Sequence, residues 1–167
     1  MKATLDGFFE AYFADMTESE RYDNRITLFR ANRSKDLLKP YCRSGTQSQR
    51  GIQPLKIDSD HEEGNEGIAG QAWFRNVTVS PPPLPECPDP WSDQDVACQD
   101  YAKHGVLSHS KAARLHVKSR SLVATPVRDC KGNQWGVLVL DSRTPDGIDP
   151  QKEPLVNAFA ATLGKVL

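Results

Sequence analysis

The chain has 167 residues, 26% of them charged, and a formal net charge of −1 at pH 7. This length is enough for one domain with a substantial buried core, and the small net charge provides no overall field that would attract nucleic acid or an anionic membrane. No apolar run approaches the length of a membrane span, and the N-terminus lacks the features of a signal peptide. The composition therefore predicts a soluble, cytoplasmic domain that binds neither nucleic acid nor membrane directly.

Residues 3–16 are the first predicted element, an amphipathic helix. Their large apolar side chains recur at i, i+3, i+4, i+7, i+8 and i+11, as they do on one face of a helix. This face is unusually aromatic, so it is expected to pack on a sheet and in part to contact a partner subunit. Its members are Leu5, Phe8, Phe9, Tyr12, Phe13 and Met16.

After a polar connection, several short strands are predicted. Residues 25–31 alternate between apolar and polar side chains, and residues 37–43 form a second strand. Pro40 within that second strand indicates an edge position or a bulge, because proline cannot donate to the ladder. Residues 55–57 and 77–79 are two further short strand candidates.

Between these two candidates, residues 67–74 are predicted to form a short helix. Asn65 is a suitable cap for its start, and Asn76 is a suitable end. Gly67 and Gly70 each cost the helix about 1 kcal/mol relative to alanine. Both glycines are therefore expected to allow close approach to a neighbouring backbone or ligand.

The next part of the chain is irregular and then helical. Six prolines fall between Pro81 and Pro90, which predicts an extended loop. A capping pattern at Ser92 and the stop signal at Gly105 predict a helix over residues 93–104. A second short helix is predicted over residues 108–116.

Residues 119–141 are predicted to form the central hairpin. Two apolar runs, 122–127 and 135–140, flank a polar turn that contains glycine. Both alternating sets of the second run are apolar or small, so this strand is expected to be covered on both faces, near the middle of a sheet.

The last predicted element is a C-terminal helix over residues 150–167, marked by Leu155, Phe159, Leu163 and Val166. No stop signal follows this pattern. One domain over residues 1–167 is therefore predicted, which is compatible with a segment of a longer protein.

Three motifs in this order resemble the GAF domain family, with the PAS fold as the nearest alternative. They are Glu66–Ala72 (EGIAGQA), Arg120–Val127 (RSLVATPV) and Trp135–Ser142 (WGVLVLDS). The resemblance implies an α+β fold with a central antiparallel sheet of five to six strands. It also implies N- and C-terminal helices on one face, and loops and short helices over a small-molecule pocket on the other. Many family members dimerise through their terminal helices.

This chain lacks the residues that several known activities of that family require. The chain has no Asn-Lys-Phe-Asp-Glu signature of cyclic-nucleotide binding, and no cysteine is followed by histidine as in bilin attachment. Free methionine sulfoxide reductases need several cysteines, one of them within the Gly-Ile-Ala-Gly motif, where this chain has Ala69. Only Cys98, in Val96-Ala97-Cys98, resembles the reactive segment of that enzyme.

The cysteines and histidines form no metal motif. Cys87, Cys98, His104 and His109 share one region, but no pair has Cys-x-x-Cys or His-Glu-x-x-His spacing. In a medium-sized cytosolic domain, scattered cysteines are expected to be reduced thiols, and this expectation includes Cys130. No metal site is predicted, and the residues identify no cofactor.

Charged residues are segregated along the middle of the chain. Residues 86–100 contain five acidic residues and no basic one, whereas residues 101–128 contain six basic residues and no acidic one. The resemblance places the basic stretch in the pocket cover and the strand beneath it. Guanidinium groups bind anions through paired hydrogen bonds, so Arg120 and Arg114 are predicted to contact a small anionic ligand. The alternative is a solvated basic face balanced by the acidic segment.

Other side chains are predicted to line the same pocket, and aromatic rings among them to stack on a planar ligand. The alternative for the aromatic residues is a purely structural place in the core. The predicted lining residues are Trp73, Phe74, Tyr101, Trp135 and Ser121 and, at lower rank, Tyr41, Cys42 and Arg43 on the second strand.

Three functions are compatible with these predictions. The leading one is a non-catalytic sensory or regulatory domain that binds a small ligand of unknown identity and signals through terminal helices in a homodimer. The second is a dimerisation module with a vestigial pocket. The third is a thiol-dependent enzyme that resembles free methionine sulfoxide reductase.

Overall fold

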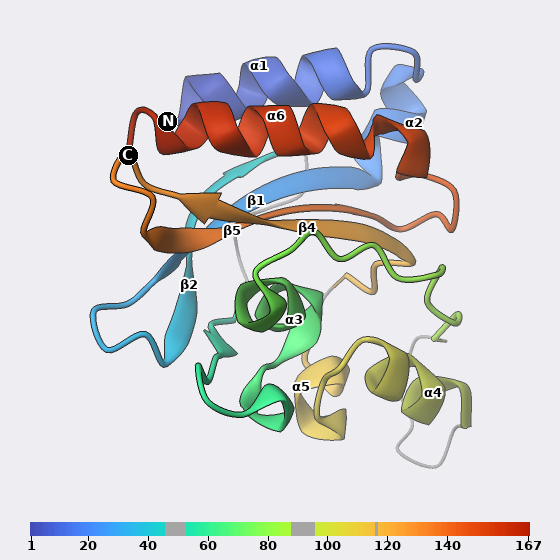
Figure 1. Cartoon of the computed structure of the whole chain (residues 1–167). Helices are drawn as coiled ribbons and strands as arrows, with labels where there is room; N and C mark the ends of the chain where they lie inside the picture. The colour runs from blue at the N-terminus through green and yellow to red at the C-terminus, as the bar shows by residue number, and fades with distance from the viewer. Residues whose placement is uncertain (46–52, 88–95, 116) are drawn as a thin grey trace.

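The structure is a computed structural model that describes residues 1–45, 53–87, 96–115 and 117–167. It has an α+β fold in which helices lie on both faces of one antiparallel sheet (Figure 1). The helices are α1 (Lys2–Tyr12), α2 (Glu18–Tyr22), α3 (Gly67–Arg75), α4 (Val96–His104), α5 (His109–Ala113) and α6 (Glu153–Gly164), with 3-10 turns η1 (Glu62–Gly64) and η2 (Pro150–Lys152). The strands are β1 (Asn24–Ala31), β2 (Leu37–Ser44), β3 (Leu55–Lys56), β4 (Ser121–Arg128) and β5 (Gln134–Ser142).

β5 lies between β1 and β4 in a sheet whose strand order is β3-β2-β1-β5-β4. Its pairing is antiparallel on both sides. Leu138 and Leu140 belong to the core beneath the terminal helices, whereas Val137 and Val139 belong to the core on the opposite face. The prediction of a central strand covered on both faces is therefore confirmed.

The terminal helices α1 and α6 lie together across one face of the sheet (Figure 1). The rings of Phe8 and Phe159 stack between them, with their centroids 3.7 Å apart and an interplanar angle of 8°. Phe9 and Phe13 are also buried in this core. Most of the aromatic face of the first helix is thus buried within the chain.

α1 ends at Tyr12, before the predicted end at residue 16. The chain then turns, and Thr17 starts α2 where only a polar connection was predicted. The hydroxyl of Thr17 accepts the backbone N–H of Glu20, and the Glu20 carboxylate accepts the backbone N–H of Thr17. This capping box stabilises a separate short helix.

β2 contains a bulge beside Pro40. Phe29 of β1 pairs with Pro40, whereas the preceding residue of β1, Leu28, pairs with Cys42, so Tyr41 is an extra residue in the ladder. The predicted irregularity at Pro40 is confirmed. The extra residue therefore determines the face of the sheet to which each following side chain of β2 points.

The helices α3, α4 and α5 lie on the other face of the sheet (Figure 1). Asn76 ends α3 as predicted, with a φ of 54°. The start of α3 differs from the prediction, because Glu66 rather than Asn65 is the cap residue. The amide nitrogen of Asn65 instead donates to the backbone carbonyls of Asp58 and His61, each at 2.8 Å, and so holds the preceding loop.

Three other predicted elements differ in extent. Residues 77–79 form only an isolated bridge, between Val79 and Ala124. The helix predicted over residues 93–104 is seen from Val96, and its first predicted residues lie outside the described ranges. α5 begins after Ser108 as predicted but is shorter. No helix within the described ranges is both long enough and apolar enough to cross a membrane.

Candidate functional site

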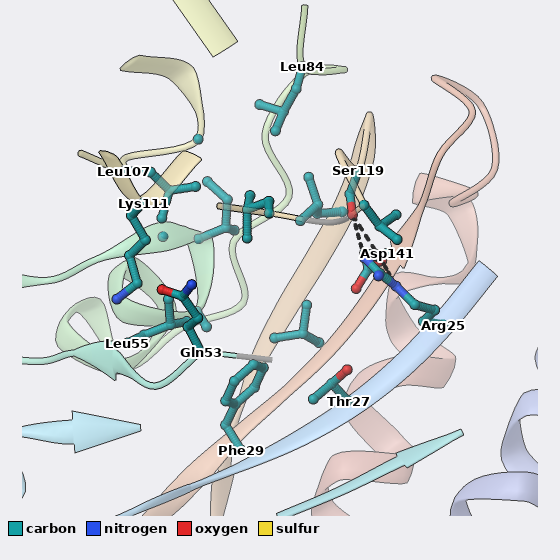
Figure 2. A pocket seen from close by; sticks show the side chains of 18 of the residues that line it. Arg25, Thr27, Phe29, Gln53, Leu55, Leu84, Leu107, Lys111, Ser119 and Asp141 are labelled. Carbon is teal, nitrogen blue, oxygen red and sulfur yellow. Dashed lines mark hydrogen bonds and ion pairs between the residues drawn. The ribbon is translucent and has the colours of Figure 1, made fainter. Parts of the chain in front are cut away.

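A cavity of about 540 Å³ lies between the sheet and the segments over it (Figure 2). This volume is within the usual range for small-molecule sites. The strands contribute Arg25, Thr27, Phe29, Arg43, Leu55, Leu122, Val139 and Asp141. The other segments contribute Gln53, Gly67, Ile68, Ala69, Leu84, Tyr101, Gly105, Leu107, Lys111, Leu115, Val117 and Ser119.

Strand alternation determines which residues of β1 face the cavity. Arg25, Thr27 and Phe29 line it, whereas Ile26 and Leu28 between them belong to the core beneath α1 and α6. Side chains of successive strand residues point to opposite faces. One strand therefore contacts both the cavity and the terminal-helix core.

Arg25, Asp141 and Ser119 form a buried polar network at one wall (Figure 2). The Nε–H of Arg25 donates to Oδ1 of Asp141 at 2.7 Å, and its Nη2 donates to Oγ of Ser119 at 2.8 Å. The Ser119 hydroxyl donates in turn to the same Asp141 oxygen at 3.0 Å. The carboxylate is thereby held by two donors and fixes the guanidinium in one orientation.

Arg43 is a second buried guanidinium at the cavity, with 9% of its surface exposed. It lies opposite Thr27 on the neighbouring strand, and its Nε–H donates to the Thr27 hydroxyl at 2.9 Å. Burial and the charge of Arg25 lower the pKa of Arg43, Asp141 acts in the opposite direction, and the net result is a pKa of about 10. The positive charge of Arg43 is therefore kept in an unfavourable environment.

Lys111 provides a third cation from α5. It forms an ion pair with Glu66, the cap residue of α3, and its Nζ also donates to the carbonyl of Pro54 at 2.6 Å. Burial raises the pKa of Glu66, but the hydrogen bonds from Lys111 and from the backbone N–H of Lys56 outweigh it, so the pKa is lowered. This ion pair joins α5 to the start of α3.

Positive charge exceeds negative charge at the cavity. Among the described lining residues, Arg25, Arg43 and Lys111 are cationic and Asp141 is the single acid. Lys111 is balanced by its ion pair with Glu66. Asp141 forms its ion pair with Arg25, so the described lining carries more positive than negative charge on that side, which favours a ligand with negative charge there.

Tyr101 of α4 and Leu84 belong to a cluster of apolar residues over the cavity. Burial raises the pKa of the Tyr101 hydroxyl well above its usual value, and the nearby Asp141 raises it further. Tyr101 therefore stays neutral at physiological pH. Cys87 packs against this cluster, and its Sγ atom lies 3.0 Å from that of Cys98 on α4.

The two glycines of the Gly-Ile-Ala-Gly motif differ, and the predicted close approach to a neighbouring backbone holds for Gly70. Gly67 lines the cavity and has a φ of 70°. A Cβ atom on Gly70 would lie 2.9 Å from the backbone carbon of Asn65.

Of the ten residues predicted to bind a ligand or line the pocket, Tyr101 and Arg43 lie in the cavity lining. The other eight lie outside that lining, and two of them, Tyr41 and Trp135, pack ring against ring with their centroids 5.3 Å apart. Trp73 is buried in the core between α3 and the sheet, and Phe74 is half-buried on the same helix. Cys42 packs against the core on the terminal-helix side of the sheet, whereas Arg43, the next residue, faces the cavity.

Of the remaining three predicted residues, two form hydrogen bonds elsewhere and one is exposed. Ser121 donates to the carbonyl of Thr144 at 2.8 Å. The Nε–H of Arg120 donates to the carbonyl of Leu84 at 3.3 Å, so it holds the segment over the cavity. Arg114 is exposed at the end of α5.

Arg25, Asp141 and Lys111 were absent from the predicted site. A signal for one of them is present in the sequence, because Asp141 is a charged residue at the end of the apolar run 135–140, whereas Arg25 belongs to a strand that alternates between apolar and polar side chains. Charges of this kind are rarely buried unless they are paired. Lys111 carries no comparable signal. Within the described ranges, no group of three His, Cys, Asp or Glu residues is arranged to hold a metal ion.

An antiparallel sheet with terminal helices on one face and a helix-covered cavity on the other defines a GAF-like domain. The family model for the GAF domain matches residues 26–167, so this chain belongs to the GAF domain family. No curated protein matches the sequence.

Solved structures with this fold include enzymes and other GAF domains. The free methionine-R-sulfoxide reductase of Neisseria meningitidis, in complex with its substrate, is 17% identical, with a TM-score of 0.60 over 97% of this chain and 74% of that one. The Staphylococcus aureus enzyme fRMsr, also in complex with substrate, is 15% identical, with a TM-score of 0.58 over 98% and 82%. The GAF domain of an Acinetobacter phosphoenolpyruvate-protein phosphotransferase is 15% identical, with a TM-score of 0.58 over 96% and 77%. At these identities the likeness shows the fold alone.

Proposed function

We propose that this chain is a non-catalytic sensory domain whose cavity binds a small anionic molecule. The observation that carries the proposal is the pair of buried guanidinium groups, Arg25 and Arg43, in a described lining whose single acid is Asp141. An anion placed beside Arg43 would relieve the unfavourable environment of that charge. The apolar part of the lining favours a ligand with an apolar body.

A direct path connects the cavity to the terminal helices. Thr27 and Phe29 line the cavity, and Ile26 and Leu28 on the same strand pack beneath α1 and α6. A ligand that binds one arrangement of β1 more tightly than another would shift the population of helix arrangements by that difference in affinity. Regulation through α1 and α6 is the output that we propose.

A matched pair of fluorescent probes tests the preference for an anion. Anilinonaphthalene sulfonate and N-phenylnaphthylamine share their aromatic body, but only the first carries a negative charge. We expect the sulfonate to bind the folded protein more tightly. We also expect Arg43→Met to weaken binding of the sulfonate by about tenfold, because one charge-assisted hydrogen bond is lost. Binding of the neutral probe should change little.

Arg114→Met is the control variant, because Arg114 is an exposed arginine outside the described lining. The proposal fails if Arg43→Met binds both probes as the unmodified chain does. A loss of sulfonate binding in Arg114→Met alone would instead support the anion site that was predicted from the order of acidic and basic residues along the sequence. Native mass spectrometry of freshly purified protein would identify a natural ligand that is retained through purification.

A homodimer through the terminal helices is part of the same proposal. Leu155 on α6 is 46% exposed, whereas Phe8 and Phe159 stack within the chain. The available apolar surface is therefore on α6 rather than on the aromatic face of α1. Sedimentation velocity should give a dimer for the unmodified chain and a monomer for Leu155→Glu, and a monomer for both would contradict this part of the proposal.

A thiol-dependent reductase is the second candidate function. Two observations favour it: solved free methionine-R-sulfoxide reductases share the fold, and the sulfurs of Cys87 and Cys98 are in contact. Two thiols would reduce a sulfoxide to a thioether and water while they form a disulfide. An assay with free methionine-R-sulfoxide and a dithiol reductant should then show turnover that Cys98→Ala abolishes. Turnover that survives both Cys98→Ala and Cys87→Ser would exclude this pair as the reductant.

A further inference from the structure

Cys87 and Cys98 form a thiol pair in the segments over the cavity. Their Sγ atoms are 3.0 Å apart, although 11 positions separate the two residues in the sequence. Cys98 is completely buried, and Cys87 is half-buried. Cys87 packs against the apolar cluster that contains Leu84 and Tyr101, and Cys98 lies on α4, the helix that carries Tyr101.

We propose that Cys87 and Cys98 form a reversible intramolecular disulfide that controls access to the cavity. A disulfide has an S–S distance of about 2.05 Å, so the sulfurs need to approach by only about 1 Å. The other two cysteines are separate from this pair. Cys42 packs against the terminal-helix core, and Cys130 is exposed in the turn between β4 and β5.

The oxidant that we propose is a hydroperoxide. The thiolate of Cys87, the more exposed of the two, attacks the peroxide and becomes a sulfenic acid, and one alcohol molecule leaves. The thiolate of Cys98 then attacks the sulfenic sulfur and displaces hydroxide, which takes up the released proton as water. Overall, two thiols and one hydroperoxide give a disulfide, an alcohol and water, and a dithiol reductant reverses the change by thiol–disulfide exchange.

The pair joins two separate parts of the cavity lining. Cys87 follows Leu84 in the chain, and Leu84 is anchored to Arg120 by a backbone hydrogen bond of 2.6 Å. Cys98 lies on α4 with Tyr101. Leu84 and Tyr101 both line the cavity. A covalent bond between Cys87 and Cys98 would therefore tie these two lining segments together and reduce the rate at which they separate.

Thiol mapping tests the disulfide itself, independently of any ligand. The folded protein is treated with hydrogen peroxide, its remaining thiols are blocked with N-ethylmaleimide, and the intact mass and digested peptides are measured. We expect the loss of two blockable thiols and a linked Cys87–Cys98 peptide, both reversed by dithiothreitol. Cys42→Ser/Cys130→Ser is the matched control and should behave as the unmodified chain does.

Cys87→Ser and Cys98→Ala complete the mapping. Neither variant should form the linked peptide, and Cys98→Ala should accumulate a sulfenic acid at Cys87 that dimedone traps. Circular dichroism confirms that the variants fold, and Cys87→Ser is the safer variant because Cys87 is half-buried. The proposal would be overturned if N-ethylmaleimide still blocked Cys87 and Cys98 completely at peroxide concentrations that oxidise Cys130.

The control of access to the cavity rests on the proposed function. It is measured as the rate at which bound anilinonaphthalene sulfonate is released. We expect its release from the oxidised protein to be slower by about fivefold or more, since tied segments open less often. Cys87→Ser should show no such change after peroxide treatment. Equal release rates before and after disulfide formation would overturn the control of access. Failure of the probe to bind the reduced protein would instead count against the proposed function, and the mapping result would stand by itself.

Discussion

Arg25 and Asp141 lie directly opposite each other on β1 and β5, and the Nε–H of Arg25 donates to the Asp141 carboxylate at 2.7 Å. Their side chains are only 8% and 7% exposed, although 116 positions separate the residues in the sequence. The removal of two charges from water is costly, and this cost is recovered only while both charges are present. The wall of the cavity thus depends on a pair that strand register brings together.

Arg25→Met is expected to destabilise the protein by about 3–5 kcal/mol, because it leaves the carboxylate of Asp141 buried without its partner. The double variant Arg25→Met/Asp141→Leu should recover most of that loss, since neither charge then remains. Urea unfolding at pH 7 measures both differences. A single variant as stable as the unmodified chain would show that Asp141 is satisfied by other donors.

Arg43→Met is expected to have the opposite effect on stability. Burial lowers the pKa of Arg43 from 12.5 to about 10, so at pH 7 the charged group opposes folding. Between about pH 10 and pH 12.5 the unfolded chain binds the proton more tightly, and in this window the contribution of Arg43 to stability rises with pH. The free energy of unfolding of Arg43→Met at pH 7 should therefore equal or exceed that of the unmodified chain, to within about 1 kcal/mol. A large loss of stability would mean that Arg43 is mainly structural.

Glu66→Gln should reduce stability by about 1 kcal/mol at pH 7, because Lys111 then loses its ionic partner. The folded-state pKa of Glu66 is lowered from 4.5, so the ion pair stabilises the protein fully above that pH and progressively less as the pH falls through the folded-state pKa. The difference between the unmodified chain and Glu66→Gln should therefore shrink in acid. Thermal unfolding from pH 7 to pH 3 measures it, and a difference independent of pH would contradict the ionic explanation.

Two helical glycines should respond to alanine in opposite ways. A Cβ atom on Gly164 of α6 would lie 1.9 Å from the carbonyl oxygen of Arg128 in β4, whereas a Cβ atom on Gly7 of α1 meets nothing within 4 Å. Gly7→Ala should raise stability by about 0.5–1 kcal/mol through helix propensity. Gly164→Ala should lower it by about 1–3 kcal/mol, because the helix must move away from the sheet. Chemical unfolding of both variants checks the contrast, and similar effects would contradict the close packing of α6 on β4.

Much of the fold could be predicted from local patterns. The two apolar alternating sets of β5 indicated a strand covered on both faces, and Pro40 indicated the bulge of β2. Asn76 marked the end of α3 because asparagine tolerates a positive φ. Each of these features depends on residues close together in the chain, and such features can be read from the sequence.

The cavity depended on tertiary structure. The bulge at Tyr41 decides that Arg43 faces the cavity while Cys42 faces the terminal helices, and a shift of one residue would exchange them. Register between distant strands places Arg25 beside Asp141. The sequence by itself thus determined the family and the order of elements, because propensity and periodicity are local. Only the packed chain decided which charges share the cavity, because that depends on contacts between residues far apart in sequence.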